Sequence, residues 1–302
     1  MAFLNRKTNT QAEATTDFRQ TAQTNLMMLA DLGIPEAVRF RDVLGFDDNP
    51  LAALEHIPLA NRIPLCIATI SEILYQRTND LIIEEHNPAV LDLACGYSPR
   101  VLVMAPRGYT YVGADLPGVA QELAEKRSQL IPNDPTLFAG YRCVDVSDRT
   151  QMEGIVAALR ERITVVTQGL LTYLTLEQKD DLMTSVQSLL SRDGGCWIIP
   201  DACPDRLLPA TFEAIMGKGG ARVAQAVYGV LDREVGRSRE QNGWRNIDEM
   251  TDALEDFGFN VKRVPLYRRE LPLWCLDKLD PEAADRLIVA WQGMSSLVVT
   301  RA

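Results

Sequence analysis

The sequence predicts an α/β fold, in which a mostly parallel sheet is wrapped by helices and preceded by a helical segment. Short apolar runs that end in small or acidic residues recur from Ala89 onward, as buried parallel strands do. Helical patterns separate these runs, which is the order of βα units. No alternating strand pattern precedes Ala89, so residues 1–85 are expected to be helical.

The composition is that of a globular protein with neither a nucleic-acid nor a membrane partner. With 302 residues, 46% of them hydrophobic, the chain can bury a full core. A net charge of -10 disfavours phosphate backbones and anionic membranes, because both require a basic face. The polar start predicts no signal peptide, and no apolar run is long enough to span a bilayer, so we expect a cytoplasmic protein. The oligomeric state stays open, a homodimer included.

The six cysteines form no Cys-x-x-Cys pair, and most lie in apolar runs. We therefore expect reduced core cysteines. Only two histidines are present, His56 and His86, which argues against a zinc site.

Helices are predicted over residues 17–32, 35–44 and 59–78 ahead of the sheet. The polar residues before Asp17 are expected to be disordered or loosely docked. We interpret residues 1–85 as a helical cap on a sheet domain of residues 86–302. The cap either packs as a structural element or closes over a ligand and excludes water.

The remaining elements alternate, and the last strand is expected to run antiparallel to the others. Thr175 and Gln178 predict a capping box. Residues 202–244 interrupt the alternation after the fifth strand and are expected to form a wall of a substrate pocket. Strands are predicted at 90–93, 109–114, 139–144, 163–167, 196–200, 259–267 and 296–300, and helices at 118–130, 149–160, 176–190, 208–216, 221–235, 246–257 and 281–292.

The stretch AVLDLACGYSPR, residues 89–100, is expected to form a cofactor site. A buried strand there runs into a tight turn, and Ser98 followed by Pro99 predicts a helix start. The second strand ends on Asp115, where nucleoside-binding βαβ units place an acid for a ribose hydroxyl. The competing interpretation is an ordinary βα turn without a ligand.

The turn disfavours a dinucleotide. The glycines of G-x-G-x-x-G let the backbone approach a pyrophosphate, but the matching positions here are Ala94, Gly96 and Pro99. Asp92, just before the turn, suits a cation better than a pyrophosphate. S-adenosylmethionine has an ammonium, a sulfonium and an adenosine but no phosphate, so it fits this pattern.

Later strands also end on polar residues, at the edge where open α/β sheets bind ligands. Asp145 follows the third strand, where it either accepts from an adenine amino group or caps the next helix together with Asp148. The fourth strand runs into the segment 168–173. The candidate cofactor-binding residues are Asp92, Ala94, Gly96, Arg100, Asp115, Leu116, Asp145, Val146, Gln168, Gly169 and Tyr173.

Three motifs, VLDLACGYSPR, GADLPGV and TQGLLTYLT, resemble those of the leucine carboxyl methyltransferase family, which includes polyketide O-methyltransferases of the tetracenomycin type. The resemblance covers about residues 86–200. It implies a Rossmann-like class I methyltransferase fold with S-adenosylmethionine as donor. It also implies that Arg100 is the motif arginine, Asp115 the ribose acid and Asp145 the adenine-side acid. Gly169 and Tyr173 match the family's fourth segment.

Four positions depart from the family pattern. Ala94 replaces the first glycine of the turn, and Ser98 with Pro99 replaces an acid and a threonine. Gln168 replaces a glutamate, which removes a charge close to the expected sulfonium.

Methyl transfer requires a nucleophile aligned behind an activated methyl group, and the exclusion of water. A carboxylate acceptor needs no base, whereas a phenol or alcohol does. His86 precedes the first strand, so His56 and Tyr173 are the candidate catalytic residues. The scarcity of candidate general bases favours a carboxylate acceptor, or a phenol assisted by an acid or Tyr173.

Arg100 either pairs with a carboxylate of the donor or acceptor, or forms a salt bridge on a helix surface.

Three functions therefore stay open at this point. The first is an O-methyltransferase acting on a carboxylate or hydroxyl of a small molecule, such as a polyketide or other secondary metabolite. The second is a methyltransferase acting on a protein C-terminal carboxylate. The third is a protein that binds NAD, against which the missing glycines count.

Overall fold

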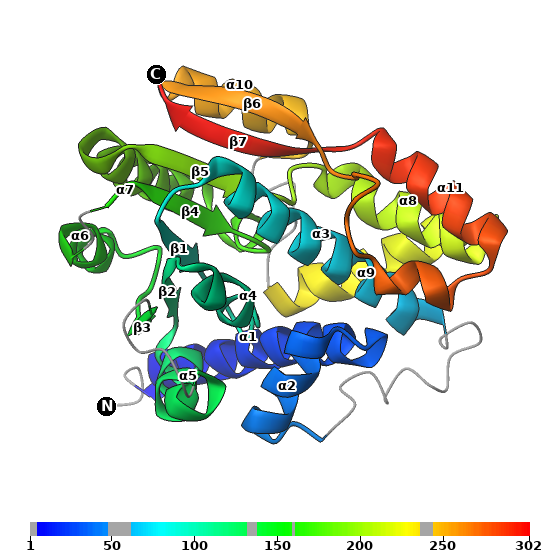
Figure 1. The fold of residues 1–302 in the computed structure, drawn as a ribbon, viewed down its shortest axis with the longest axis horizontal. Helices are drawn as coiled ribbons and strands as arrows, with labels where there is room; N and C mark the ends of the chain where they lie inside the picture. Colours follow the sequence, from blue (N-terminus) through cyan, green and yellow to red (C-terminus); the bar gives the residue numbers. More distant parts are fainter. Residues whose placement is uncertain (1–4, 48–61, 132–137, 159–160, 236–243) are drawn as a thin grey trace.

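The computed structural model describes residues 5–47, 62–131, 138–158, 161–235 and 244–302, which build one sheet with helices on both faces (Figure 1). In this part of the chain the seven strands follow the order β3-β2-β1-β4-β5-β7-β6. Strand β7 runs antiparallel to β5 and β6, and the other pairs are parallel, as the sequence predicted. The strands are β1 (Ala89–Leu93), β2 (Thr110–Asp115), β3 (Phe138–Cys143), β4 (Ile163–Thr167), β5 (Gly195–Ile199), β6 (Phe259–Pro265) and β7 (Ser295–Arg301).

Most predicted helices are confirmed to within a few residues. The Thr175 hydroxyl accepts from the Gln178 N–H at 3.2 Å, and the Gln178 side chain accepts from the Thr175 N–H at 2.9 Å, so the capping box is confirmed. The helices are α1 (Asn5–Leu32), α2 (Pro35–Leu44), α3 (Ile63–Glu85), α4 (Val101–Met104), α5 (Pro117–Leu130), α6 (Arg149–Ala158), α7 (Leu176–Asp193), α8 (Pro204–Met216), α9 (Gly220–Val235), α10 (Ile247–Asp256) and α11 (Pro281–Gln292), with short 3-10 helices η3 (Ala105–Arg107), η4 (Leu171–Tyr173) and η6 (Trp274–Lys278).

Three predicted boundaries were wrong. Helix α1 begins at Asn5, so the residues from there to 16 are helical rather than disordered. Helix α3 continues past residue 78 to Glu85, because the polar residues there have partners within the fold. The helix after β1 does not start at Ser98, whose hydroxyl caps nothing; it is the four-residue α4.

The sheet divides the hydrophobic core into two layers. Successive residues of β1 face opposite sides, since side chains alternate along a strand. Val90 belongs to a cluster shared with α1, α2 and α3, whereas Leu91 belongs to one shared with α6, α7 and α10. The helices that precede the sheet are therefore built into its core.

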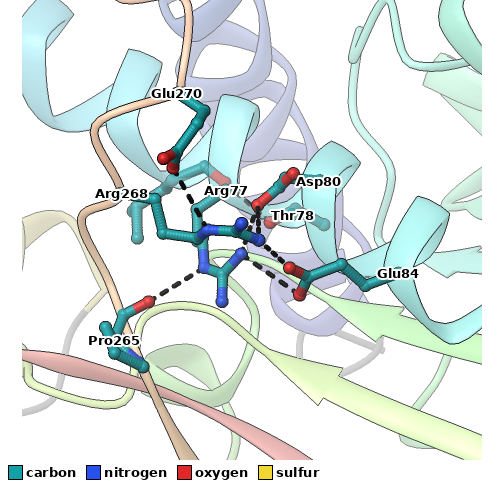
Figure 2. A network of polar contacts seen from close by, with 8 residues as sticks. Arg77, Thr78, Asp80, Glu84, Pro265, Arg268 and Glu270 are labelled. Atoms are coloured by element: carbon teal, nitrogen blue, oxygen red, sulfur yellow. Dashed lines mark hydrogen bonds and ion pairs between the residues drawn. The ribbon is translucent and has the colours of Figure 1, made fainter.

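A charged cluster joins α3 to the segment that follows β6. Figure 2 shows the guanidinium groups of Arg77 and Arg268 beside the carboxylates of Asp80 and Glu84. Arg77 is buried and also donates to the carbonyl of Pro265 at 2.9 Å. Burial lowers the pKa of Arg77, and Asp80 opposes that effect. The cluster fixes the part of α3 that adjoins the sheet edge described next.

In the described part of the chain, no helix combines the length and apolarity that crossing a bilayer requires. All six cysteines are free; five are buried and Cys143 is exposed. The expectation that most cysteines are core residues is confirmed.

Candidate functional site at the carboxyl edge of the sheet

The turn after β1 is built on two left-handed residues. Ala94 has φ +50° and Gly96 has φ +52°. Glycine adopts this region freely, but an alanine there costs about 1–2 kcal/mol because its Cβ crowds the backbone. Ala94 thus holds a backbone conformation that glycine adopts more easily, at a cost in stability.

Helix α1 lies against this turn. A Cβ added to Gly96 would come within 3.1 Å of the Ala22 Cβ, so the glycine allows a close approach. Arg19 of α1 donates to the Tyr97 hydroxyl at 2.9 Å and to Glu122 of α5 at 2.7 Å. Tyr97 donates to the same Glu122 carboxylate at 2.5 Å. These contacts join α1, the turn and α5, and so cover the end of β1.

Asp115 ends β2 and is half-buried. One carboxylate oxygen accepts from the Gly96 N–H at 2.7 Å, and the other accepts from the Leu116 N–H at 2.8 Å. Burial raises the pKa of Asp115, and these two N–H groups oppose the rise. Each carboxylate oxygen can accept more than one hydrogen bond, so Asp115 retains capacity toward a ligand.

Asp92 lies in the core, and the cation beside it is Arg100 of the same chain. Tyr111 also donates to this carboxylate, at 2.6 Å. Burial lowers the pKa of Arg100, but Asp92 and the neighbouring tyrosines outweigh it and leave the pKa raised. The sequence suggested a ligand's cation for Asp92 and either a ligand or a surface partner for Arg100. The structure instead pairs the two residues with each other.

Gln168 completes this buried network. Its side-chain oxygen accepts from Arg100 at 2.7 Å and from the Thr78 hydroxyl of α3 at 3.3 Å. Arg100 donates a further hydrogen bond to Asn79 of α3 at 2.9 Å. Because Asp92 already neutralises Arg100, a neutral amide is sufficient at position 168.

The tip of β3 carries two aspartates with different partners. Asp148 accepts from the N–H groups of Thr150 and Gln151 and therefore caps α6. Asp145 accepts from the N–H of Ser147 at 2.9 Å and from its hydroxyl at 2.6 Å, which is a local turn rather than the helix cap.

The tips of β4 and β5 meet at Gly169 and Asp201. The exposed Gly169, with φ +72°, donates its N–H to Asp201 at 3.1 Å. Tyr173 ends η4 nearby along the chain and is half-buried. Asp201 was not among the sequence candidates. Like Asp115 and Asp145, Asp201 is an acid at or just after the end of a strand, so the same sequence pattern also predicts it.

The structure thus gathers most candidates at one edge, since parallel strands end on the same side of a sheet. His56 lies outside the described residues. The candidates that end strands or follow them at this edge are Ala94, Gly96, Asp115, Leu116, Asp145, Val146, Gln168, Gly169 and Tyr173.

Comparison of the chain with models of protein families gives no match, and comparison with curated proteins gives none either. Solved structures do match. A proposed methyltransferase from Thermobifida fusca has a TM-score of 0.51 and 17% identity, over 87% of this chain and 92% of that one. An O-methyltransferase family protein from Burkholderia thailandensis has a TM-score of 0.45 and 14% identity, over 92% of this chain and 71% of that one.

At this identity the match to the Thermobifida structure concerns the fold. The chain has the Rossmann-like sheet of class I methyltransferases, as the resemblance implied. Membership of the leucine carboxyl methyltransferase family stays a prediction, and so do the roles of the individual site residues.

Proposed function

We propose that this protein is an S-adenosylmethionine-dependent O-methyltransferase that acts on a small molecule, such as a polyketide or other secondary metabolite. The observation that carries the proposal is the pairing of Asp115, at the tip of β2, with a β1 turn that leads into the short helix α4, which is continued only by the 3-10 helix η3. A dinucleotide site uses the N-terminus of a long helix to bind pyrophosphate. Helix α4 offers little of that dipole, so a nucleoside ligand without phosphate suits this edge better.

The adenosine end of the ligand fits the tips of β2 and β3. Asp115 is half-buried, held by backbone N–H groups and without a cationic partner among the described side chains, so ribose hydroxyls are suitable donors to it. Leu116, which follows Asp115 and is half-buried, would supply apolar surface for an adenine ring, and the buried Val146 would support it from the core. Asp145 lies at the same edge, where an adenine amino group would donate.

The methionine end fits the gap between the tips of β1 and β4. The strand order reverses there, and open α/β sheets bind ligands at such a switch point. Ala94, Gln168 and Gly169 lie at this position. Bound S-adenosylmethionine would supply an electrophilic methyl carbon on a positive sulfur. The chain's own contribution would be to orient the two substrates and, through α1, to exclude water.

Calorimetry tests the proposal directly. Wild-type protein should release or absorb heat on titration with S-adenosylhomocysteine, the demethylated product, and give no binding signal with NADH. Asp145→Asn should weaken product binding by no more than about 5-fold if its adenine contact is a single hydrogen bond, since such bonds contribute about 1 kcal/mol. A saturable signal with NADH, and none with S-adenosylhomocysteine, would reverse the assignment.

A further inference from the structure

Asp201 is a carboxylate at the ligand edge with unused hydrogen-bonding capacity. It follows β5, and its Oδ2 accepts from the Gly169 N–H at 3.1 Å. Its Oδ1 is buried and has no hydrogen-bond partner. A buried carboxylate oxygen without a donor is costly, so such an atom calls for a proton or a ligand donor.

The surroundings of Asp201 favour its protonated form. Burial raises the pKa of Asp201 to about 6, while the N–H groups of Asp201 itself and of Gly169 oppose the rise. No charged side chain of the described residues on β4, β5, α8 or β7 contributes to this shift. The nearby Asp205 and Arg206 of α8 act on the Cys203 thiol instead. Near neutral pH, Asp201 is therefore mostly ionised, and it is a stronger base than an ordinary aspartate.

We propose that Asp201 is the general base of this site and that the methyl acceptor is a neutral hydroxyl group, a phenol, rather than a carboxylate. This inference rests on the proposed function. Asp201 lies at the tip of β5 beside Gly169, on the side of the switch point where an acceptor would meet the methionine end. Its unpartnered Oδ1 is an acceptor for the hydroxyl proton.

A carboxylate acceptor fits this position poorly. Two carboxylates that share one site repel each other, because both charges lose solvation and no cation compensates them. The guanidinium of Arg100, which contacts Asp92 of β1 and Gln168 just after β4, is already neutralised by Asp92. The chain's net charge of -10 adds to the repulsion. A phenol enters uncharged and loses its proton only when the reaction begins.

The proposed methyl transfer needs no reactant besides the methyl donor and the hydroxyl acceptor. The hydroxyl proton moves to Asp201 Oδ1 as a lone pair of the hydroxyl oxygen forms the bond to the methyl carbon. The bond between that carbon and sulfur breaks, and its electron pair returns to sulfur as a neutral thioether. The proton on Asp201 then leaves to water after the product departs.

The experiment compares Asp201→Asn with the wild type and with the matched control Asp205→Asn, which removes the same charge at an exposed position of α8. Asparagine keeps an oxygen that can accept from Gly169, so the fold is expected to persist. Three properties are measured: the titration of Asp201 by carboxyl-carbon NMR in the ligand-free protein, the affinity for S-adenosylhomocysteine by calorimetry, and labelled methyl transfer to matched probes. The probes are 1-naphthol, 4-nitrophenol and 1-naphthoate.

The inference expects an Asp201 titration near pH 6, unchanged product affinity in both variants, and methyl transfer to 1-naphthol that falls about 100-fold or more in Asp201→Asn. The loss should be smaller with 4-nitrophenol, which ionises near neutral pH without help, and should shrink for 1-naphthol as the pH rises. Transfer to 1-naphthoate alone, transfer to no phenol, full activity of Asp201→Asn, or a titration near pH 4 would each overturn it. Absence of product binding to the wild type would instead contradict the proposed function.

Discussion

Asp92 and Asp115 lie on neighbouring strands close to the same edge, yet their surroundings differ. Asp92 is buried against Arg100 and Tyr111, so the chain itself supplies its counter-charge. Asp115 is half-buried and held by two backbone N–H groups. Asp201 resembles Asp115, because a backbone N–H, that of Gly169, donates to one carboxylate oxygen, and its other oxygen has no hydrogen-bond partner. The comparison suggests that a carboxylate paired within the chain supports the edge, while one held by backbone alone is available to a ligand.

The largest effect that would test this contrast comes from breaking the buried pair. Arg100→Met should lower the free energy of unfolding by about 3–5 kcal/mol, because it leaves Asp92 charged and uncompensated in the core. Urea denaturation measures it. Arg107→Met, at an exposed position in η3, is the control and should change stability by less than about 0.5 kcal/mol. Equal small effects of the two substitutions would mean that Asp92 is not held by Arg100.

The pH dependence of stability tests the other half of the comparison, the carboxylate of Asp201 that is held by backbone alone. The pKa of Asp201 is raised to about 6 in the folded protein. Its contribution to stability therefore favours folding at pH values below the pKa of Asp201 in the unfolded chain, and this contribution is lost as pH rises through 6. Asp201→Asn should therefore stabilise the protein more at pH 7.5 than at pH 4, by on the order of 2 kcal/mol. Urea denaturation at the two pH values measures this difference.

Asp148 provides a control of opposite sign. Hydrogen bonds from Gln151 lower the pKa of this helix cap. The contribution of Asp148 to stability is present at pH values above its pKa in the unfolded chain. It is lost as pH falls through the pKa of Asp148 in the folded protein. Asp148→Asn should thus lose more stability at neutral pH than at low pH. The same trend in both variants would argue that a global charge effect, rather than the burial of Asp201, causes the change.

Asp115→Ala should weaken S-adenosylhomocysteine binding by about 10- to 100-fold, since hydrogen bonds to a charged group contribute about 1.5–3 kcal/mol. Calorimetry measures the affinity, and circular dichroism should show an intact fold. Glu122→Ala, which removes a carboxylate of α5 from the α1 contact, is the comparison: we expect a smaller loss of affinity. Unchanged binding in Asp115→Ala would remove Asp115 from the proposed site.

The smallest expected effect concerns the backbone of the turn that follows β1. Ala94→Gly should stabilise the protein by about 0.5–1 kcal/mol, because relief of the left-handed strain exceeds the added entropy of the unfolded chain. Thermal denaturation measures it. Gly96→Ala should act in the opposite direction, since its Cβ would crowd Ala22 of α1. A destabilising Ala94→Gly would show that the Ala94 methyl has a packing role that outweighs the strain.

Local patterns in the sequence were enough to predict most of the fold. The capping box at Thr175 and the strand over Ile163–Thr167 were both predicted, because hydrogen bonds to near neighbours and runs of apolar residues are visible within a short window. The start of helix α4 was placed too early, at Pro99 rather than at Val101. Its boundary depends on the left-handed turn at Ala94 and Gly96, and an alanine gives no sign of that conformation.

By itself, then, the sequence determined the element order and the acids that follow the strands, since period and turn chemistry are local properties. Only the tertiary structure decided which acids face a partner from the chain. Arg100 meets a side chain 68 residues away at Gln168, and Asp201 meets a backbone N–H 32 residues away at Gly169. Such contacts follow from strand order and crossing helices, so no pattern within one segment contains them.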